Sequence, residues 1–253
     1  MRHKLLKKLI GTLGYKLISK NGVKNERLLG NFNYLNLPKV LEYLTKNKLV
    51  KSVIQIGAND GNRFDDLNIF IKKYKIKSIL VEPIKENFEE LKKNYKNIEN
   101  IIFENSAISV GNELSFLYKV KSDYLGCYGE HVKGISSFSR NHLINHGVRG
   151  SHIEKQIINS ISIKELLNKH KVNSFDLLFL DAEGYDGNIL NDFLMDNIIK
   201  PYIIFEYIHI DNAIFKVLIQ KLNKQNYNFF NINENIICVP EGKNFLFLNP
   251  IQK

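Results

Sequence analysis

The sequence has few cysteines and no long apolar run. Only Cys127 and Cys238 occur among 253 residues, far apart and outside any CxxC or Cys/His spacing. This argues against a disulfide framework and a structural zinc site, and it is typical of a protein of the reducing cytoplasm. No hydrophobic run approaches the length of a membrane-spanning helix. One water-soluble domain with one appended segment is therefore expected.

Acidic residues are absent from the N-terminus until Glu26. Between residues 5 and 18, leucines and isoleucines recur at helical spacing opposite lysines, which predicts a basic amphipathic helix in a segment of residues 1–37. No small-residue cleavage site follows, so a secretory signal is not expected. Two roles fit the helix. It packs on the domain or on a second subunit of a homodimer, or it brings a cytoplasmic protein into contact with anionic lipid.

The chain carries a formal net charge of +10, which favours anionic partners. The lysines are spread along the chain and form no stripe, and no nucleic-acid-binding motif accompanies them. Nucleic acid is therefore not expected as a partner.

From residue 50 onward, short apolar runs alternate with amphipathic helical patterns. This alternation predicts an α/β fold with a doubly wound, mostly parallel sheet in a domain of residues 38–253. The pattern breaks over residues 120–155, which are rich in Gly, Ser, His and Arg, and we interpret this segment as a substrate-facing insertion. The predicted strands lie near residues 51–57, 77–82, 98–109, 174–181 and 201–206, followed by a hairpin of 227–232 and 236–240.

The first strand leads into a glycine turn, SVIQIGANDGNRFDDL, over residues 52–67. Gly57 and Gly61 allow the backbone to approach a ligand closely. The turn lacks the third glycine of GxGxxG and the GKS or GKT end of a P-loop, so it is a poor match to a pyrophosphate site. A cofactor with adenosine but no phosphate, such as S-adenosylmethionine, fits better.

Carboxylates follow the ends of several predicted strands. Glu82 ends the second strand, where it can accept hydrogen bonds from both hydroxyls of a ribose. Its alternative role is to cap the helix after Pro83. Ligands of open α/β sheets bind beyond the carboxyl ends of the strands, so acids gathered at this edge of a basic protein predict a binding site. The other residues at strand ends are Asp181, Glu183, Asp186, Glu206, His209 and Asp211.

Five segments in order, VIQIGANDG, LVEP, FENSAIS, DLLFLDAEGYDGNIL and IIFEY, resemble the FkbM-type S-adenosylmethionine-dependent methyltransferases over residues 50–239. The resemblance implies the class I methyltransferase sheet, with strand order 3-2-1-4-5-7-6 and the last strand antiparallel. The hairpin predicted independently agrees with this order. The resemblance also implies methyl transfer to oxygen, often on sugars of bacterial capsules or other surface polysaccharides.

The same resemblance implies which residues contact the cofactor. Gln55 stands where the family often has an acid. Its amide can still hydrogen-bond the cofactor, or it can be a buried polar residue satisfied by the backbone. The implied contacts are Gly57, Ala58, Asn59 and Gly61 for the methionine part, Glu82 for the ribose, Asn105, Ser106 and Ala107 for the adenine, and Asp181 for the amino group or the methyl.

A sugar hydroxyl is a weak acid and needs a general base close to the methyl group. Asp181, Glu183, Glu206 and His209 qualify by position, with His209 favoured because histidine titrates near neutrality. His142, His146 and His152 also qualify if the insertion folds over the site. The acids of DAEGYD and FEYIH form an alternative site for a divalent metal such as magnesium, although no metal ligand is predicted.

The insertion supplies donors for a substrate. The basic chain favours an anionic activated sugar, and a nucleoside-diphosphate hexose or heptose is the leading hypothesis. The alternatives are a lipid-linked or polymeric glycan at the membrane, an RNA- or nucleotide-binding protein, and a non-catalytic subunit that binds no cofactor. The expected substrate contacts are Ser136, Ser137, Arg140, His142 and Arg149.

Overall fold

The computed structural model describes residues 36–63, 65–111, 116–129, 132, 134–196 and 199–245. These belong to a compact unit that begins at Asn36. The helix predicted between residues 5 and 18 lies outside the described residues. In the described part of the chain, no helix combines the length and apolarity needed to cross a membrane.

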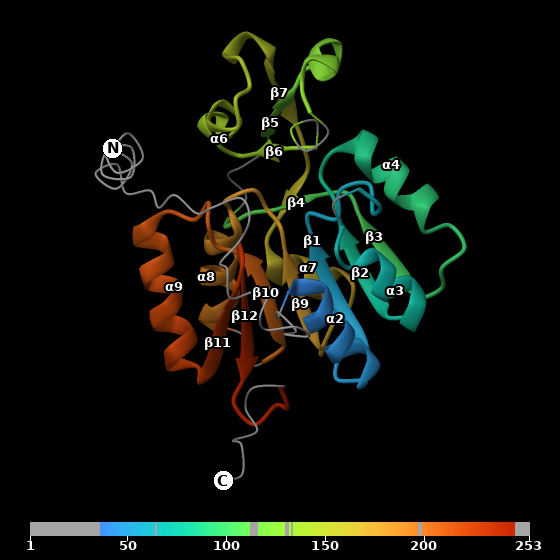
Figure 1. The fold of residues 1–253 in the computed structure, drawn as a ribbon, viewed down its shortest axis with the longest axis vertical. Coiled ribbons are helices and arrows are strands. Elements are labelled where there is room, and N and C mark those ends of the chain that lie inside the picture. The colour runs from blue at the N-terminus through green and yellow to red at the C-terminus, as the bar shows by residue number, and fades with distance from the viewer. Residues whose placement is uncertain are drawn as a thin grey trace, which may run out of the picture. The chain divides into compact units, whose positions relative to one another are not determined.

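A seven-stranded sheet forms the centre of the unit (Figure 1). Its order is β11-β12-β10-β9-β1-β2-β3, and β12 is antiparallel to both of its neighbours. Numbered by sequence within this sheet, the order is 3-2-1-4-5-7-6, as the resemblance implies. The strands are β1 (Ser52–Ile56), β2 (Lys77–Val81), β3 (Ile101–Glu104), β9 (Leu177–Leu180), β10 (Tyr202–Glu206), β11 (Tyr227–Ile232) and β12 (Asn235–Pro240).

Helices cover the sheet, which is why β1, β9 and β10 are nearly continuous apolar runs. α7, α8 and α9 form a contiguous row and share one apolar core with the sheet, while α2 contacts α3. A capping box of Ser162 and Glu165 begins α7, and Asp211 caps α9. Asp211 is thus a helix cap. The helices are α2 (Leu37–Lys46), α3 (Asn68–Tyr74), α4 (Lys85–Asn94), α7 (Ile163–Lys169), α8 (Asp186–Asp196) and α9 (Asn212–Lys224).

The insertion between β3 and β9 is a small folded layer, at the top of Figure 1. Three antiparallel strands in the order β6-β5-β7 cover an apolar cluster of their own. The insertion is wider than the predicted 120–155, because its central strand β5 begins at Phe116 and pairs along its whole length with β7, which ends at Ile157. Its elements are β4 (Ala107–Ile108), β5 (Phe116–Val120), η2 (Ser122–Cys127), β6 (Ser136–Ser137), α6 (Arg140–Asn145), η3 (Gly150–His152), β7 (Ile153–Ile157) and β8 (Ser160–Ile161).

Candidate active site

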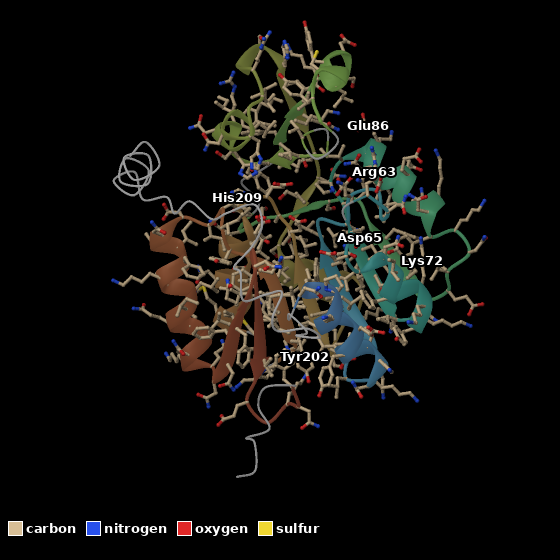
Figure 2. The ribbon with its side chains drawn as sticks, viewed as in Figure 1. Arg63, Asp65, Lys72, Glu86, Tyr202 and His209 are labelled. Carbon is tan, nitrogen blue, oxygen red and sulfur yellow. The ribbon has the colours of Figure 1, made fainter. Side chains whose placement is uncertain are left out.

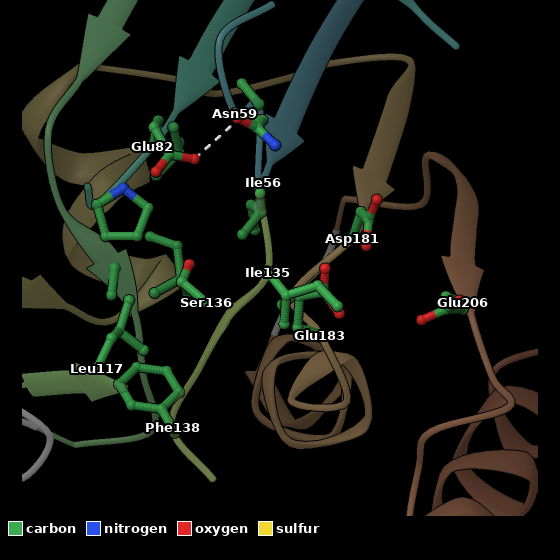
Figure 3. A pocket seen from close by; sticks show the side chains of 18 of the residues that line it. Ile56, Asn59, Glu82, Leu117, Ile135, Ser136, Phe138, Asp181, Glu183 and Glu206 are labelled. Carbon is green, nitrogen blue, oxygen red and sulfur yellow. Dashed lines mark hydrogen bonds between the residues drawn. The ribbon is translucent and has the colours of Figure 1, made fainter. Parts of the chain in front are cut away.

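A cavity of about 490 Å³ lies between the carboxyl ends of the central strands and the insertion (Figure 3). Its position agrees with the rule for open α/β sheets. Most of the residues predicted for the site line this cavity. They are Gly57, Ala58, Asn59, Glu82, Ser106, Ala107, Ser136, Asp181, Glu183, Glu206 and His209.

Gly57 allows the chain to turn directly after β1. Its φ is +83°, and a Cβ built there would lie 1.9 Å from the carbonyl oxygen of Asp181. The amides of Gly57 and Ala58 both donate to the carbonyl of Val81, at 3.0 Å each. Only glycine fits at this point, so the backbone of Gly57, without a side chain, forms this part of the cavity wall.

Gly61 does not line the cavity, contrary to the prediction. A Cβ at this position would meet the side chains of Leu91 and Tyr95, the first of which belongs to α4. Gly61 therefore allows the turn to pack closely against neighbouring side chains, and the second glycine of the motif has a packing role.

Glu82 joins the glycine turn to the start of α4. Its Oε2 accepts the amide of Asn59 at 3.0 Å (Figure 3). Its Oε1 accepts the amide of Ile84 at 2.8 Å. Burial raises the pKa of Glu82 to about 7. The side chain of Asn87 also donates to this carboxylate, which still has acceptor capacity for a ligand hydroxyl. The capping role and a ligand-binding role are thus compatible.

Asn105 does not line the cavity, although it was predicted to border an adenine. Its amide nitrogen donates to the carbonyls of Glu82, at 2.8 Å, and Pro83, at 3.2 Å. The side chain is therefore used to hold the loop after β2, while Ser106 and Ala107 line the cavity.

Gln55 is buried and contacts Asp65, a residue that was not predicted for the site. The Gln55 amide donates to Oδ1 of Asp65 at 3.0 Å, and Asp65 lines the cavity whereas Gln55 does not. The same oxygen accepts the amides of Leu67 and Asn68. The carboxylate on this side of the cavity thus comes from the loop after the glycine turn. In the sequence, the two adjacent acids of FDDL, Asp65 and Asp66, were the signal that could have identified this carboxylate.

We expect Gln55→Glu to lower the free energy of unfolding by about 2–4 kcal/mol, because it places a second carboxylate beside the partly buried Asp65 and removes its donor. The double variant Gln55→Glu with Asp65→Asn exchanges donor and acceptor and should recover most of the loss. Urea unfolding of the three proteins measures the effect. A single variant as stable as the wild type would show that the pairing does not matter.

Three carboxylates lie across the cavity from Glu82. Figure 3 shows them as Asp181, Glu183 and Glu206. Asp181 is accessible from the cavity but otherwise surrounded by protein. Burial, then the nearby carboxylates of Glu183 and Asp186, raise its pKa well above the usual range. Burial likewise raises the pKa of Glu206 to about 8. Among the described residues, none that lines the cavity is a lysine or an arginine. The site is acidic within a basic protein.

Three histidines meet where the insertion joins the sheet, at the place of His209 in Figure 2. The ring centroid of His209 lies 4.8 Å from that of His142 and 5.0 Å from that of His146. Burial and these two neighbours lower the pKa of His209. Nε2 of His142 lies 2.9 Å from Oε2 of Glu183. His142, predicted as a substrate contact, thus belongs to a histidine cluster beside the cavity.

Three other predicted substrate contacts do not line the cavity. Ser137 donates its hydroxyl to the carbonyl of Glu183 at 3.0 Å, which ties the insertion to the loop after β9. Arg140 is exposed and donates to the carbonyl of Gly150 at 2.9 Å. Arg149 is also exposed. Long basic side chains are more stable in water, so they remain at the surface of the insertion.

The apolar part of the wall was not predicted. Leu117, Ile135 and Phe138 from the insertion and Ile208 from the loop after β10 face the cavity. The ring of Phe138 packs on that of Tyr185 with centroids 4.6 Å apart. No local sequence pattern marks these residues, because the folding of the insertion brings them to the site.

The sheet order and the cavity over a glycine turn are those of a class I methyltransferase. A sequence model described as Methyltransferase FkbM domain matches residues 55–229. The chain therefore belongs to the FkbM methyltransferase family. No curated protein matches the chain.

Solved structures of methyltransferases are similar to the chain at low identity. An FkbM methyltransferase from Methylobacillus flagellatus KT is 12% identical over 76% of this chain and 44% of that one, with a TM-score of 0.45. A methyltransferase from Geobacter sulfurreducens is 12% identical over 85% and 83%, with a TM-score of 0.40. Fibrillarin from Aeropyrum pernix, crystallised with bound S-adenosyl-L-methionine, is 9% identical over 75% and 66%, with a TM-score of 0.40. At these scores the likeness supports no conclusion about substrate or mechanism.

Proposed function

We propose that the protein is an S-adenosylmethionine-dependent O-methyltransferase that acts on a sugar hydroxyl. The observation that carries the proposal is an acidic cavity over a glycine turn, without lysine or arginine among its described lining residues. S-adenosylmethionine carries a sulfonium and an ammonium group, which carboxylates attract, and no phosphate. Membership of a methyltransferase family supports the same cofactor.

The two sides of the cavity suit the two ends of this cofactor. Glu82, buried at the end of β2, would accept the ribose hydroxyls, with Ser106 and Ala107 beside the adenine. Asp181, across the glycine turn, would hold the ammonium group. When bound, the cofactor supplies an electrophilic methyl group, so the remaining task of the protein is to orient an oxygen and remove its proton.

Of the four residues predicted to remove the proton, Glu206 and His209 suit the role best. Both line the cavity, and Nε2 of His209 lies 3.9 Å from Oε1 of Glu206. Asp181 lies beside the glycine turn and is better placed for the cofactor, since a Cβ on Gly57 would overlap its carbonyl oxygen. Glu183 is engaged by His142.

The proposed acceptor is a nucleoside-diphosphate hexose or heptose destined for a bacterial surface polysaccharide. The apolar wall with Ser136 would receive the sugar. Because the described cavity lining has no cation, the diphosphate would lie outside, near the exposed Arg140 and Arg149. The net charge of +10 supports an anionic acceptor.

The test combines binding and turnover. Calorimetric titration with S-adenosylhomocysteine is expected to show one site, and labelled methyl transfer is expected with nucleotide-linked but not free hexoses or heptoses. Absence of S-adenosylhomocysteine binding would refute the cofactor assignment. Equal transfer to free and nucleotide-linked sugars would refute the proposed form of the acceptor.

We expect the affinity for S-adenosylhomocysteine to fall as the pH is lowered through about 7, the pKa of Glu82. The ionised carboxylate accepts ribose hydroxyls, and protonation removes its charge and one acceptor. One pH unit below that pKa about nine-tenths of the group is protonated, so the Kd should rise up to about tenfold between pH 8 and pH 6. In Glu82→Gln this part of the pH dependence should be absent. An unchanged profile in the variant would contradict the assignment.

A further inference from the structure

The histidine cluster of His142, His146 and His209 is assembled from two segments distant in sequence. His142 lies in α6, and His146 is the residue that caps the C-terminal end of this helix. The two histidines are four residues apart, about one helical turn, and therefore lie on the same face of α6. His209 comes from the loop after β10. Each residue offers a ring nitrogen, and the three nitrogens lie within 4.8 Å of one another. Such an arrangement brings together three nitrogens that can serve as metal ligands.

From this geometry we propose that His142, His146 and His209 bind a divalent transition-metal ion of the zinc type. Three histidines with an open fourth position are typical of catalytic zinc sites, and the HxxxH spacing within a segment is common in them. Imidazole nitrogen suits zinc, cobalt or nickel, whereas magnesium prefers oxygen. Zinc–nitrogen bonds of ~2.1 Å require nitrogens ~3.4 Å apart, which side-chain rotation in these partly buried residues can supply.

The surroundings of the cluster resemble those of bound metal sites. Histidines that bind metals usually donate their other nitrogen to a carboxylate, which fixes the ring. Nε2 of His142 lies 2.9 Å from Glu183, which leaves its Nδ1 for the ion. Nε2 of His209 lies 3.9 Å from Oε1 of Glu206, which is within ion-pair distance but too long for a hydrogen bond. Carboxylates thus lie beside two of the three rings.

The location differs from the magnesium site considered from the sequence. Among the described residues, the acids at the ends of β9 and β10 form no group of three with metal-ligand spacing, whereas the histidines do. His146 and His209 line the cavity, so an ion would be reached from it. The open position would face an acceptor oxygen.

The role of the ion in turnover rests on the proposed function, whereas binding does not. A coordinated hydroxyl is more acidic than a free one. Its proton passes to the carboxylate of Glu206, its oxygen forms a bond to the methyl carbon, and the electron pair of the broken carbon–sulfur bond stays on the sulfur of S-adenosylhomocysteine. His209 is then a ligand, and Glu206 is the proton acceptor.

The test uses full-length, tag-free protein stripped with EDTA and dialysed. Titration with Co²⁺ is expected to give one equivalent with the visible absorption of a tetrahedral ion, and Zn²⁺ should displace it. His146→Gln and, separately, His209→Gln should weaken Co²⁺ binding at least 100-fold. The control His152→Gln alters a histidine of the same insertion that stacks on Tyr124, and it should bind as the wild type does. Circular dichroism checks that each variant folds.

Wild-type protein that binds no Co²⁺, or folded variants that bind it equally well, would overturn the proposal. A parallel titration with S-adenosylhomocysteine distinguishes failure of the metal site from failure of the proposed function. Cofactor binding without metal binding refutes only the metal site, and metal binding without cofactor binding refutes only the proposed function. In turnover, EDTA should lower kcat at least tenfold and Zn²⁺ should restore it. Unchanged kcat would overturn the role of the ion.

Discussion

Gly57→Ala is expected to lower the free energy of unfolding by about 3 kcal/mol or more and to abolish cofactor binding. The new Cβ would lie 1.9 Å from the carbonyl oxygen of Asp181, and backbone at a φ of +83° strains any residue with a side chain. The clash can be relieved only if the ends of β1 and β9 move apart. Ile56 pairs with Leu180 at this point, so the movement would disrupt the sheet. Urea unfolding and S-adenosylhomocysteine titration measure the two effects.

Gly147→Ala is the matched control for this prediction. Gly147 has the same φ of +83°, but nothing lies within 4 Å of a Cβ built there. This variant carries only the backbone strain, roughly 1 kcal/mol, and should bind S-adenosylhomocysteine as the wild type does. Equal losses in the two variants would show that contact with Asp181 contributes nothing.

Glu82→Gln is expected to weaken S-adenosylhomocysteine binding at least 100-fold at pH 8. The substitution keeps the size of the side chain and one acceptor oxygen, but it removes the charge and puts a donor where the amide of Asn59 or Ile84 donates. Charge-assisted hydrogen bonds are about twice as strong as neutral ones, and the proposed bonds from the ribose hydroxyls to this buried carboxylate would lose their charge assistance. Isothermal titration at pH 8 measures the change.

Glu90→Gln provides the control, because Glu90 lies exposed on α4 and pairs only with Lys93 in the structure as described. It should leave both stability and binding unchanged. Glu82→Ala, by contrast, leaves two amides without their acceptor and should also unfold at lower urea concentration. If Glu82→Gln binds S-adenosylhomocysteine as tightly as Glu90→Gln does, Glu82 does not hold the ribose.

The sequence predicted the sheet because its signals are local. Apolar runs on buried parallel strands, a glycine where only glycine fits, and carboxylates at strand ends each occupy a few consecutive residues. The hairpin of β11 and β12 likewise has a short turn between two apolar runs. These elements define the strand order once the family resemblance is added, and they locate Glu82 and Asp181 at the cavity.

The parts that were missed or left conditional depend on contacts between distant segments. His146 was expected at the site only if the insertion folds over it; it does, and His146 lines the cavity close to His209. The role of Gln55 depends on its hydrogen bond to Asp65, ten residues later, and not on its own position in the strand alone. Arg140 and Arg149 were expected at the substrate because of their chemistry, but they do not line the cavity, and their exposure on the insertion is set by the fold of that layer. The HxxxH spacing was the one local signal available for the cluster.

The apolar cluster inside the insertion has an evolutionary consequence. Val120, Leu143 and Val148 pack with one another, and Ser137 ties this layer to the loop after β9. A layer with its own core can change its outer residues without disturbing Glu82, provided that Gly134 keeps its close approach to Asn59 of the glycine turn. Diversification of acceptors within such a family can therefore proceed by replacing one module while the cofactor-binding half stays the same.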